Sequence, residues 1–160
     1  MEAAAVFLLA AILSFGIGSF MISSTRLWFF ISGRQSAVKT AQSVMNRLVN
    51  DIKDIKSKTS ILKMITYEVQ YIPYDSPNSI DYKQVGSNLM RVQGTNNDIL
   101  ATGLISPEGK GLRFTYLNSL EGWTGTSTEV RSIRVLVYLT AGGQSVTLES
   151  SARIRAFEVH

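Results

Sequence analysis

The chain has 160 residues, with 16 Lys and Arg residues against 12 Asp and Glu residues and a mean hydropathy of +0.11. This composition is too apolar for a disordered tail and too charged for a membrane protein with several spans, and the length fits one domain plus one extra element. Cysteine is absent and the single histidine is His160, so zinc–thiolate sites, cysteine nucleophiles and most histidine-based catalysis have no residues to use.

The net charge of +4 is concentrated in one segment. Residues 26–63 hold eight basic and two acidic side chains, for +6, whereas residues 1–25 and residues 64–160 each sum to −1. The basic character therefore belongs to one stretch and does not indicate a nucleic-acid-binding domain. The simplest interpretation is the solvated side of an amphipathic helix; contact with anionic lipid headgroups or DNA phosphates is the alternative.

Residues 3–25 form an uncharged, apolar run of 23 residues. A helix of this length covers roughly 34 Å, enough to span a bilayer. A secretory signal peptide would show a basic start, a shorter apolar stretch and an Ala-x-Ala-like exit, so we expect a membrane-inserted helix instead. All nearby bases follow the run. The positive-inside rule would then place the C-terminal part in the cytoplasm, unless a basic leader precedes Met1 and sets the opposite orientation.

An amphipathic half is expected to follow the apolar run. From Arg34 onward apolar residues recur at spacings of three and four, which predicts one buried stripe on a helix. The stripe consists of Val38, Ala41, Met45, Leu48, Ile52 and Ile55, widened by Ala37 and Val44. No proline interrupts residues 1–72, so nothing in the sequence forces the helix to stop between the two halves.

We therefore predict one helix from near Glu2 to about Lys56, roughly 80 Å long. Soft points are expected at Gly16 and Gly18 inside the apolar half and at Ser32–Gly33. Two separate helices with a hinge at Ser32–Gly33 are the alternative.

The remaining hundred residues or so indicate strands. Strands are predicted at 65–71, 88–93, 112–117, 129–139 and 145–157, with turns at 74–79, 94–97 and 141–144. Ile133, Val135, Val137 and Leu139 share one face, and the Gly-Gly step at 142–143 suits a tight hairpin.

Five or six strands without a second long helix predict an α+β fold, with a small antiparallel sheet wrapped on residues 34–56. We divide the chain into a transmembrane or filament-core half-helix (1–25), an amphipathic half-helix (26–58) and a β-sheet head (59–160).

Catalytic and metal-binding motifs are weak. The Gly103–Gly111 segment superficially resembles a phosphate-binding loop, but its glycine spacing is wrong and a strand follows where a helix should begin. Asp75, Asp81 and Asp98 are expected in loops and could supply calcium ligands, although their spacing matches no calcium loop and solvated acids are the simpler interpretation. We expect no cofactor, no metal and no enzymatic activity, and His160 to be a bystander.

An apolar helix that continues into an amphipathic helix and an antiparallel sheet resembles the type IV pilin superfamily. Within it, the chain is most similar to minor pilins and to the J-type minor pseudopilins of type II secretion. Glu2 before Ala-Ala-Ala-Val-Phe-Leu-Leu resembles the glutamate that heads the family's hydrophobic segment. The stretch 42–52 resembles the helix end of this subgroup, including its closing Asp51. Looser likenesses follow in order at Thr66–Val69, Leu89–Arg91, Phe114–Tyr116, Trp123 and Val130–Val135.

The chain departs from the family pattern in two places. Prepilins begin with a short basic leader ending in glycine, and four mature residues usually precede the glutamate, whereas here only Met1 precedes Glu2. We expect the sequence to start inside a longer precursor, whose basic leader would also resolve the orientation conflict. The helix-breaking proline of many pilins is missing, and Gly16 and Gly18 could loosen the helix in its place.

The resemblance implies a subunit held by one span in the inner membrane and then assembled into a periplasmic or extracellular filament. Its partners would be other pilin or pseudopilin subunits, inner-membrane lipid, a prepilin peptidase and an assembly platform; DNA is not indicated. Glu2 would pair with the free α-amine of an adjacent subunit, with Gly16 and Gly18 in the same assembly segment. A solvated acid at a frayed helix end is the alternative for Glu2.

The leading functional hypothesis is a minor pilin or pseudopilin acting in initiation or at the tip. A major subunit of a pilus or archaellum-like filament is a second hypothesis, because Glu2-Ala-Ala-Ala also resembles the start of archaellin helices. The third hypothesis is a single-pass membrane-anchored binding domain outside any filament.

Overall fold

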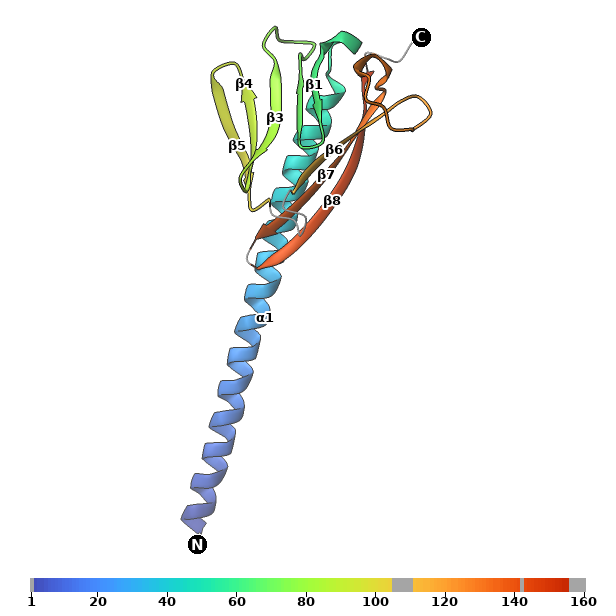
Figure 1. Cartoon of the computed structure of the whole chain (residues 1–160). Coiled ribbons are helices and arrows are strands. Elements are labelled where there is room, and N and C mark those ends of the chain that lie inside the picture. Colours follow the sequence, from blue (N-terminus) through green and yellow to red (C-terminus); the bar gives the residue numbers. More distant parts are fainter. Residues whose placement is uncertain (1, 105–110, 142, 156–160) are drawn as a thin grey trace.

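The computed structural model describes residues 2–104, 111–141 and 143–155, apart from the side chains of residues 2–6, 8, 58 and 141. A single long helix, α1 (Glu2–Lys53), carries a β-sheet head on its C-terminal half and projects from it as a bare shaft (Figure 1). This confirms the predicted α+β class and its arrangement.

Two antiparallel sheets form the head. The five-stranded sheet has the order β1 (Ile61–Ile65), β2 (Glu68–Tyr71), β3 (Ile80–Val85), β4 (Asn88–Gln93) and β5 (Asn96–Thr102). The three-stranded sheet has the order β6 (Leu112–Leu117), β7 (Ser132–Ala141) and β8 (Gln144–Arg153). Two short 3-10 helices are also present, η1 (Lys58–Ser60) and η2 (Ser127–Glu129).

The helix is continuous through Gly16, Gly18 and Ser32–Gly33, so one helix is confirmed and the two-helix alternative is wrong. It ends at Lys53, three residues before the predicted end. There the backbone N–H groups of residues 54 and 55 donate to the carbonyls of residues 51 and 52, an i to i−3 pattern in place of the α-helical i to i−4 pattern. Ile55 then pairs with Pro73 in an isolated bridge, which turns the chain into the head. A helix of 52 residues is about 78 Å long.

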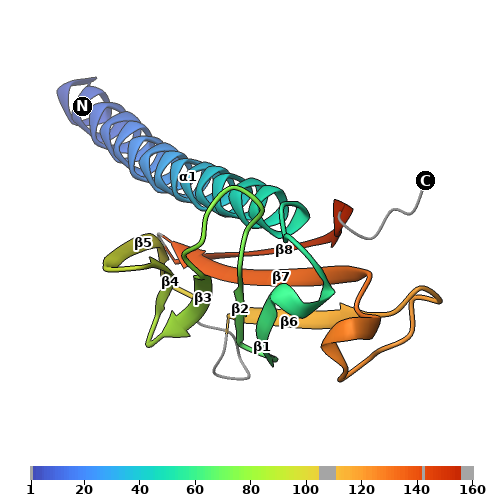
Figure 2. The same ribbon diagram turned by 90° about the horizontal axis from the view of Figure 1, so that it is seen from above.

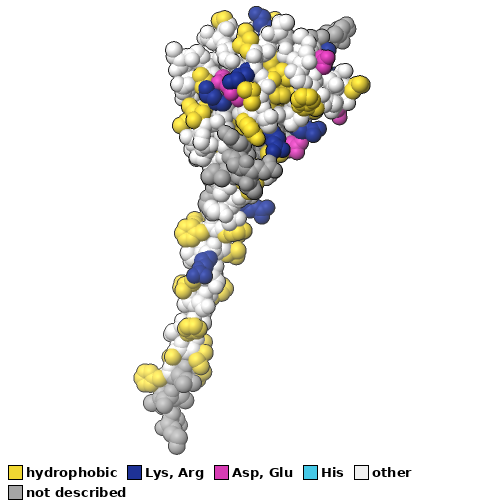
Figure 3. Space-filling model, in the orientation of Figure 1, with side chains coloured by type: hydrophobic (Ala, Val, Ile, Leu, Met, Phe, Trp, Pro, Cys, Tyr) yellow, Lys and Arg dark blue, Asp and Glu magenta, His cyan; other side chains and the backbone are white. Residues whose placement is uncertain are grey.

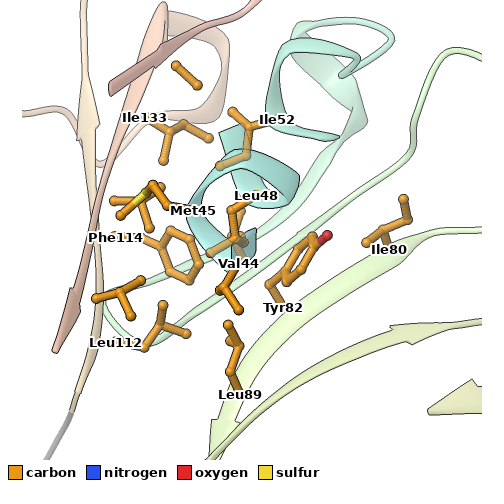
Figure 4. Close-up of a cluster of buried hydrophobic side chains, with 14 of the residues drawn as sticks. Val44, Met45, Leu48, Ile52, Ile80, Tyr82, Leu89, Leu112, Phe114 and Ile133 are labelled. Carbon is orange, nitrogen blue, oxygen red and sulfur yellow. The ribbon is translucent and has the colours of Figure 1, made fainter. Parts of the chain in front are cut away.

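The predicted stripe on the helix is the centre of the core. Every stripe residue except the half-buried Val38 is buried. The helix packs against β7 and β8 and lies over the three-stranded sheet (Figure 2). Val44, Met45, Leu48 and Ile52 face side chains of both sheets in one apolar cluster (Figure 4). Facing them there are Ile80, Tyr82, Leu89, Leu112, Phe114 and Ile133.

Several strand predictions are confirmed. Strands β4 and β6 match the predicted ranges, and β7 and β8 form the expected hairpin. Both ends of β7 and the start of β8 are shifted by one to three residues, and β8 ends at Arg153, before the predicted end at residue 157. Ile133, Val135, Val137 and Leu139 are all buried on one face of β7. The turn at 74–79 is also confirmed.

Other strand predictions are wrong. The strand predicted at 65–71 is two strands, β1 and β2, joined by a turn at Thr66–Tyr67. Strands β3 and β5 were missed, so the described residues hold eight strands in two sheets rather than five or six in one. Asp81 lies in β3 and Asp98 in β5, not in loops, and residues 96–97 belong to β5 rather than to a turn.

The segments on either side of residues 105–110 connect the two sheets. Thr140 donates its backbone N–H to Gly103 O, and Tyr138 donates to Gly111 O. Gly103 has φ +84°, and a Cβ there would lie 2.2 Å from Thr140 O, so the close approach requires glycine. Gln84 of β3 completes the link, because its side chain bonds Leu104 O, Gly111 N and Leu112 N. Residues 105–110 of the rejected phosphate-loop segment lie outside the described residues.

Candidate functional site: the exposed half of the helix

The shaft, defined here as residues 7–33 of α1, makes no burying contact with the head. Large apolar side chains cover it on all sides: Phe7, Leu9, Ile12, Leu13, Phe15, Ile17, Phe20, Met21, Ile22, Leu27, Trp28, Phe29, Phe30 and Ile31. Phe15 is 82% exposed, and hydrophobic side chains line the visible face of the shaft in Figure 3. Such a surface is stable only when lipid or other apolar helices cover it.

The shaft is compatible with a membrane span. By length and composition, α1 contains one stretch, close to the N-terminus, that is apolar enough to cross a bilayer. The aromatic side chains Trp28 and Phe29 stand near its head-side end with ring centroids 5.6 Å apart in an edge-on arrangement. Tryptophan at such a position is typical of the membrane–water interface.

The predicted assembly residues all lie on this half of the helix. Glu2 is the first residue of α1, and its side chain lies outside the described residues. Gly16 is exposed and Gly18 is half-buried, and a Cβ added at either would meet nothing within 4 Å. No contact with another described residue therefore requires glycine at these two positions, and their role in assembly stays a prediction.

A polar cluster fixes the head to the other end of the helix. Asp51, in the last turn of α1, accepts hydrogen bonds from Tyr82 Oη of β3 and from Arg91 Nε of β4, the latter at 3.1 Å. The Arg91 side chain is only 12% exposed and that of Asp51 is 24% exposed. The resemblance to pilins included Asp51 and Arg91 in separate segments, but their pairing was not predicted. Tyr82 was missed together with strand β3.

Burial raises the pKa of three tyrosines of the head, Tyr71, Tyr82 and Tyr116. Burial raises the pKa of Tyr82, and the hydrogen bond and negative charge of Asp51 raise it further. Burial also raises the pKa of Tyr71, whose hydroxyl has no hydrogen-bond partner among the described residues. The pKa of Tyr116 is raised mainly by burial, although its hydroxyl donates to the carbonyls of Ile65 and Glu68.

These tyrosines should make the head labile in alkali. An unfolded tyrosine has a pKa of about 10, so above that pH the unfolded chain releases phenol protons that the folded head retains. The contribution of these tyrosines to stability should therefore be constant below about pH 10, and stability should fall above that pH by about 1.4 kcal/mol per pH unit for each of them. Urea unfolding of the full chain in mild detergent at a series of pH values measures this slope. Tyr82→Phe should make it shallower, and an unchanged slope would contradict the assignment.

The calcium-ligand alternative has no support among the described residues. Asp81 forms an ion pair with Lys83 at 3.1 Å, and Asp98 lies 3.7 Å from Arg47. Asp75 is exposed and lies beside the C-terminal end of the helix, six residues before Asp81 in the chain. Within the described ranges, no group of three potential metal-ligating side chains converges. His160 lies outside those ranges.

Comparisons with known proteins do not place the chain in a family. No protein-family model matches it, and no curated protein matches it either. The geometry of the described residues is an exposed apolar half of one continuous helix, whose other half packs against an antiparallel β-sheet head.

Proposed function

We propose that the chain is a structural subunit of a type IV pilus-like or type II secretion filament, acting as a minor pilin or pseudopilin in initiation or tip assembly. The observation that supports this proposal is the division of one unbroken helix into a buried half and an apolar shaft. A membrane anchor alone needs only a span, whereas a rigid shaft continuous with the head would also transmit the head's position to a bundle of neighbouring helices.

In this proposal the shaft has two successive environments. Residues 3–25 lie in the inner membrane before assembly, and neighbouring shafts cover the same side chains in the filament. Leaving lipid is possible because the apolar area is covered again, at about 25 cal/mol per Å² relative to water. The polar cluster at Asp51 keeps the head in place on the helix during the transfer. No catalysis is required of the subunit.

A second candidate function is a single-pass membrane-anchored binding domain, which is favoured by the presence of one segment apolar enough to span a bilayer. The two functions differ in where the chain is found. A filament subunit is released from cells when surface filaments are sheared, whereas an anchored domain stays with the membrane. A major subunit differs from a minor one in abundance within the sheared fraction.

Mass spectrometry of the N-terminal peptide, on sheared filaments and on membranes, tests the proposal. A processed, N-methylated terminus in the sheared fraction would support it, and the ratio to other subunits would separate minor from major. An unprocessed N-terminus found only in membranes would overturn it and leave the anchored domain. Because the chain has no cysteine, single cysteines at Ser14 and Ser23 would also report shaft–shaft contacts by cross-linking.

Glu2→Ala should reduce incorporation into filaments several-fold while leaving the head folded. A charge in an apolar bundle costs several kcal/mol unless it is paired, so the proposed pairing with a neighbouring α-amine would set the position of an incoming subunit. Immunoblots of sheared and membrane fractions measure incorporation. Asp75→Ala removes an exposed head acid and is the matched control. Normal incorporation of Glu2→Ala would exclude the pairing.

A further inference from the structure

Two adjoining hollows lie on the surface of α1. The first, of about 440 Å³, includes Ser14, Gly18, Ile22 and Arg26 in its lining. The second, of about 650 Å³, includes Phe30, Arg34, Val38 and Gln42. These eight residues are spaced by four, so they form one row that is inclined to the helix axis and winds around it by about 40° per step, and the two hollows follow each other along this row. We call this feature the shaft groove.

Basic and aromatic side chains gather where the shaft groove approaches the head. Arg26, Arg34 and Lys39 are exposed, and none of the three forms an ion pair with another described residue. Trp28 and Phe30 stand between the two arginines in the sequence, and Trp28 is 66% exposed. In Figure 3 the basic side chains visible on the projecting part of the helix lie only in its portion closer to the head. Unpaired cations beside interfacial aromatics match the anionic headgroup layer of a membrane.

The length of the groove's first hollow fits one lipid leaflet. Twelve residues separate Ser14 from Arg26, a distance of about 18 Å along a helix. Half of a hydrocarbon core of about 30 Å is about 15 Å. Small side chains keep this part hollow, and at Gly18 even an added Cβ would touch nothing within 4 Å. An acyl chain that starts at Arg26 therefore has an open path of the right length toward Ser14.

We propose that the shaft groove binds an anionic phospholipid, with its phosphate between Arg26 and Arg34 and an acyl chain running past Gly18 toward Ser14. Charge favours this occupant over a second copy of the chain. A parallel copy at the same height would bring three further cations against Arg26, Arg34 and Lys39. This inference rests on the membrane-inserted state of the proposed function and names the lipid that the subunit would hold there.

Quenching of Trp28 by brominated lipids tests the inference. The chain has two tryptophans, so the full chain with Trp123→Phe reports from Trp28 alone. It is reconstituted in phosphatidylcholine vesicles containing a minor fraction of phosphatidylglycerol, with bromine on the acyl chains of either lipid at equal mole fraction. We expect stronger quenching by the brominated phosphatidylglycerol. The apparent affinity for that lipid should fall roughly fivefold for each of Arg26→Gln and Arg34→Gln.

Two further variants separate charge from shape. Lys53→Gln combined with Lys56→Gln removes two bases at the far end of the helix and should leave the preference unchanged. Gly18→Leu fills the groove without altering charge, and it should weaken quenching by brominated phosphatidylglycerol while insertion persists.

Each other outcome is decisive. If Trp28 is quenched by neither brominated lipid, the shaft does not insert and the proposed function fails in its membrane stage. If both lipids quench equally, or the arginine variants keep the preference, the chain inserts but the lipid site is excluded. If Gly18→Leu changes self-association and not lipid quenching, the groove is a contact between subunits, and the lipid site is again excluded.

Discussion

Leu48→Ala should lower the free energy of unfolding of the head by about 2–5 kcal/mol. Leu48 is fully buried on the face of α1 that meets both sheets, among Val44, Tyr82, Leu89 and Phe114 (Figure 4). Because both sheets contact this position, neither sheet can move in to fill a cavity there without losing its contacts with the other sheet. A head of this size has a stability of only about 5–15 kcal/mol, so the loss is a large part of the total.

Urea unfolding of the full chain in mild detergent measures this effect. Trp123 fluorescence in a Trp28→Phe background follows the head rather than the shaft. Asn46→Ala is the matched control, because Asn46 is exposed on the same stretch of helix and its replacement should change stability by about 0.5 kcal/mol or less. A loss below about 1 kcal/mol for Leu48→Ala would contradict the central position that the structure gives this residue.

The helix was predictable because its evidence is local and repeated. An uncharged run followed by apolar residues at spacings of three and four fixes both the element and its buried face, and no proline stands between them. Strand β6 and the β7–β8 hairpin were predictable for the same reason, since alternation and a Gly-Gly step lie within one short window. The end of the helix was placed three residues late because Ile55 continues the apolar spacing after the helix has stopped.

The errors in the five-stranded sheet have identifiable causes. Thr66–Tyr67 is a two-residue turn that contains no glycine, proline, asparagine or aspartate. Because the turn has an even number of residues, the alternation of apolar and polar side chains continues unchanged from Ile65 to Val69. The sequence therefore reads as one strand through the turn. Strand β3 buries Asp81 and Gln84 together with Ile80 and Tyr82, so it shows no simple apolar pattern. The buried side chain of Gln84 bonds Leu104, Gly111 and Leu112, which lie 20 or more residues further along the chain, outside any short window of sequence.

The candidate site also has one part that could be predicted from the sequence, the shaft, and one part that could not, the polar cluster at Asp51. The apolar shaft could be predicted from composition, because residues 3–25 form an uncharged apolar run long enough to span a bilayer. The cluster of Asp51, Tyr82 and Arg91 could not be predicted, because its members are 31 and 40 residues apart and depend on strands whose positions were missed or left unpaired. Only the folded head brings the three residues together, and their contribution to the free energy of unfolding can be measured directly.

Asp51→Ala should destabilise the head by about 3 kcal/mol or more. It leaves the largely buried guanidinium of Arg91 without its carboxylate and the hydroxyl of Tyr82 without its acceptor. Burial alone would lower the pKa of Arg91, but the hydrogen bond to Asp51 and the nearby Tyr82 raise it, so Arg91 stays charged and its partner matters. The same urea measurement applies, with the exposed pair Arg134 and Glu149 as a control: Glu149→Ala should cost about 1 kcal/mol or less.

A double variant separates the cost of an orphaned charge from the value of the pair itself. Asp51→Leu with Arg91→Met replaces the ion pair by apolar side chains, and it should recover most of the stability lost in Asp51→Ala, because no unpaired charge remains buried. If the double variant is as unstable as the single one, the unpaired charge is not the cause of the loss, and the hydrogen bonds and packing of the cluster are what stabilise the head. If Asp51→Ala costs less than about 1 kcal/mol, water replaces the carboxylate and the cluster does not fix the head to the helix. Because Asp51 lies in the last turn of α1 and Arg91 in β4, full destabilisation in the single variant would show that this contact between the helix and the five-stranded sheet stabilises the head.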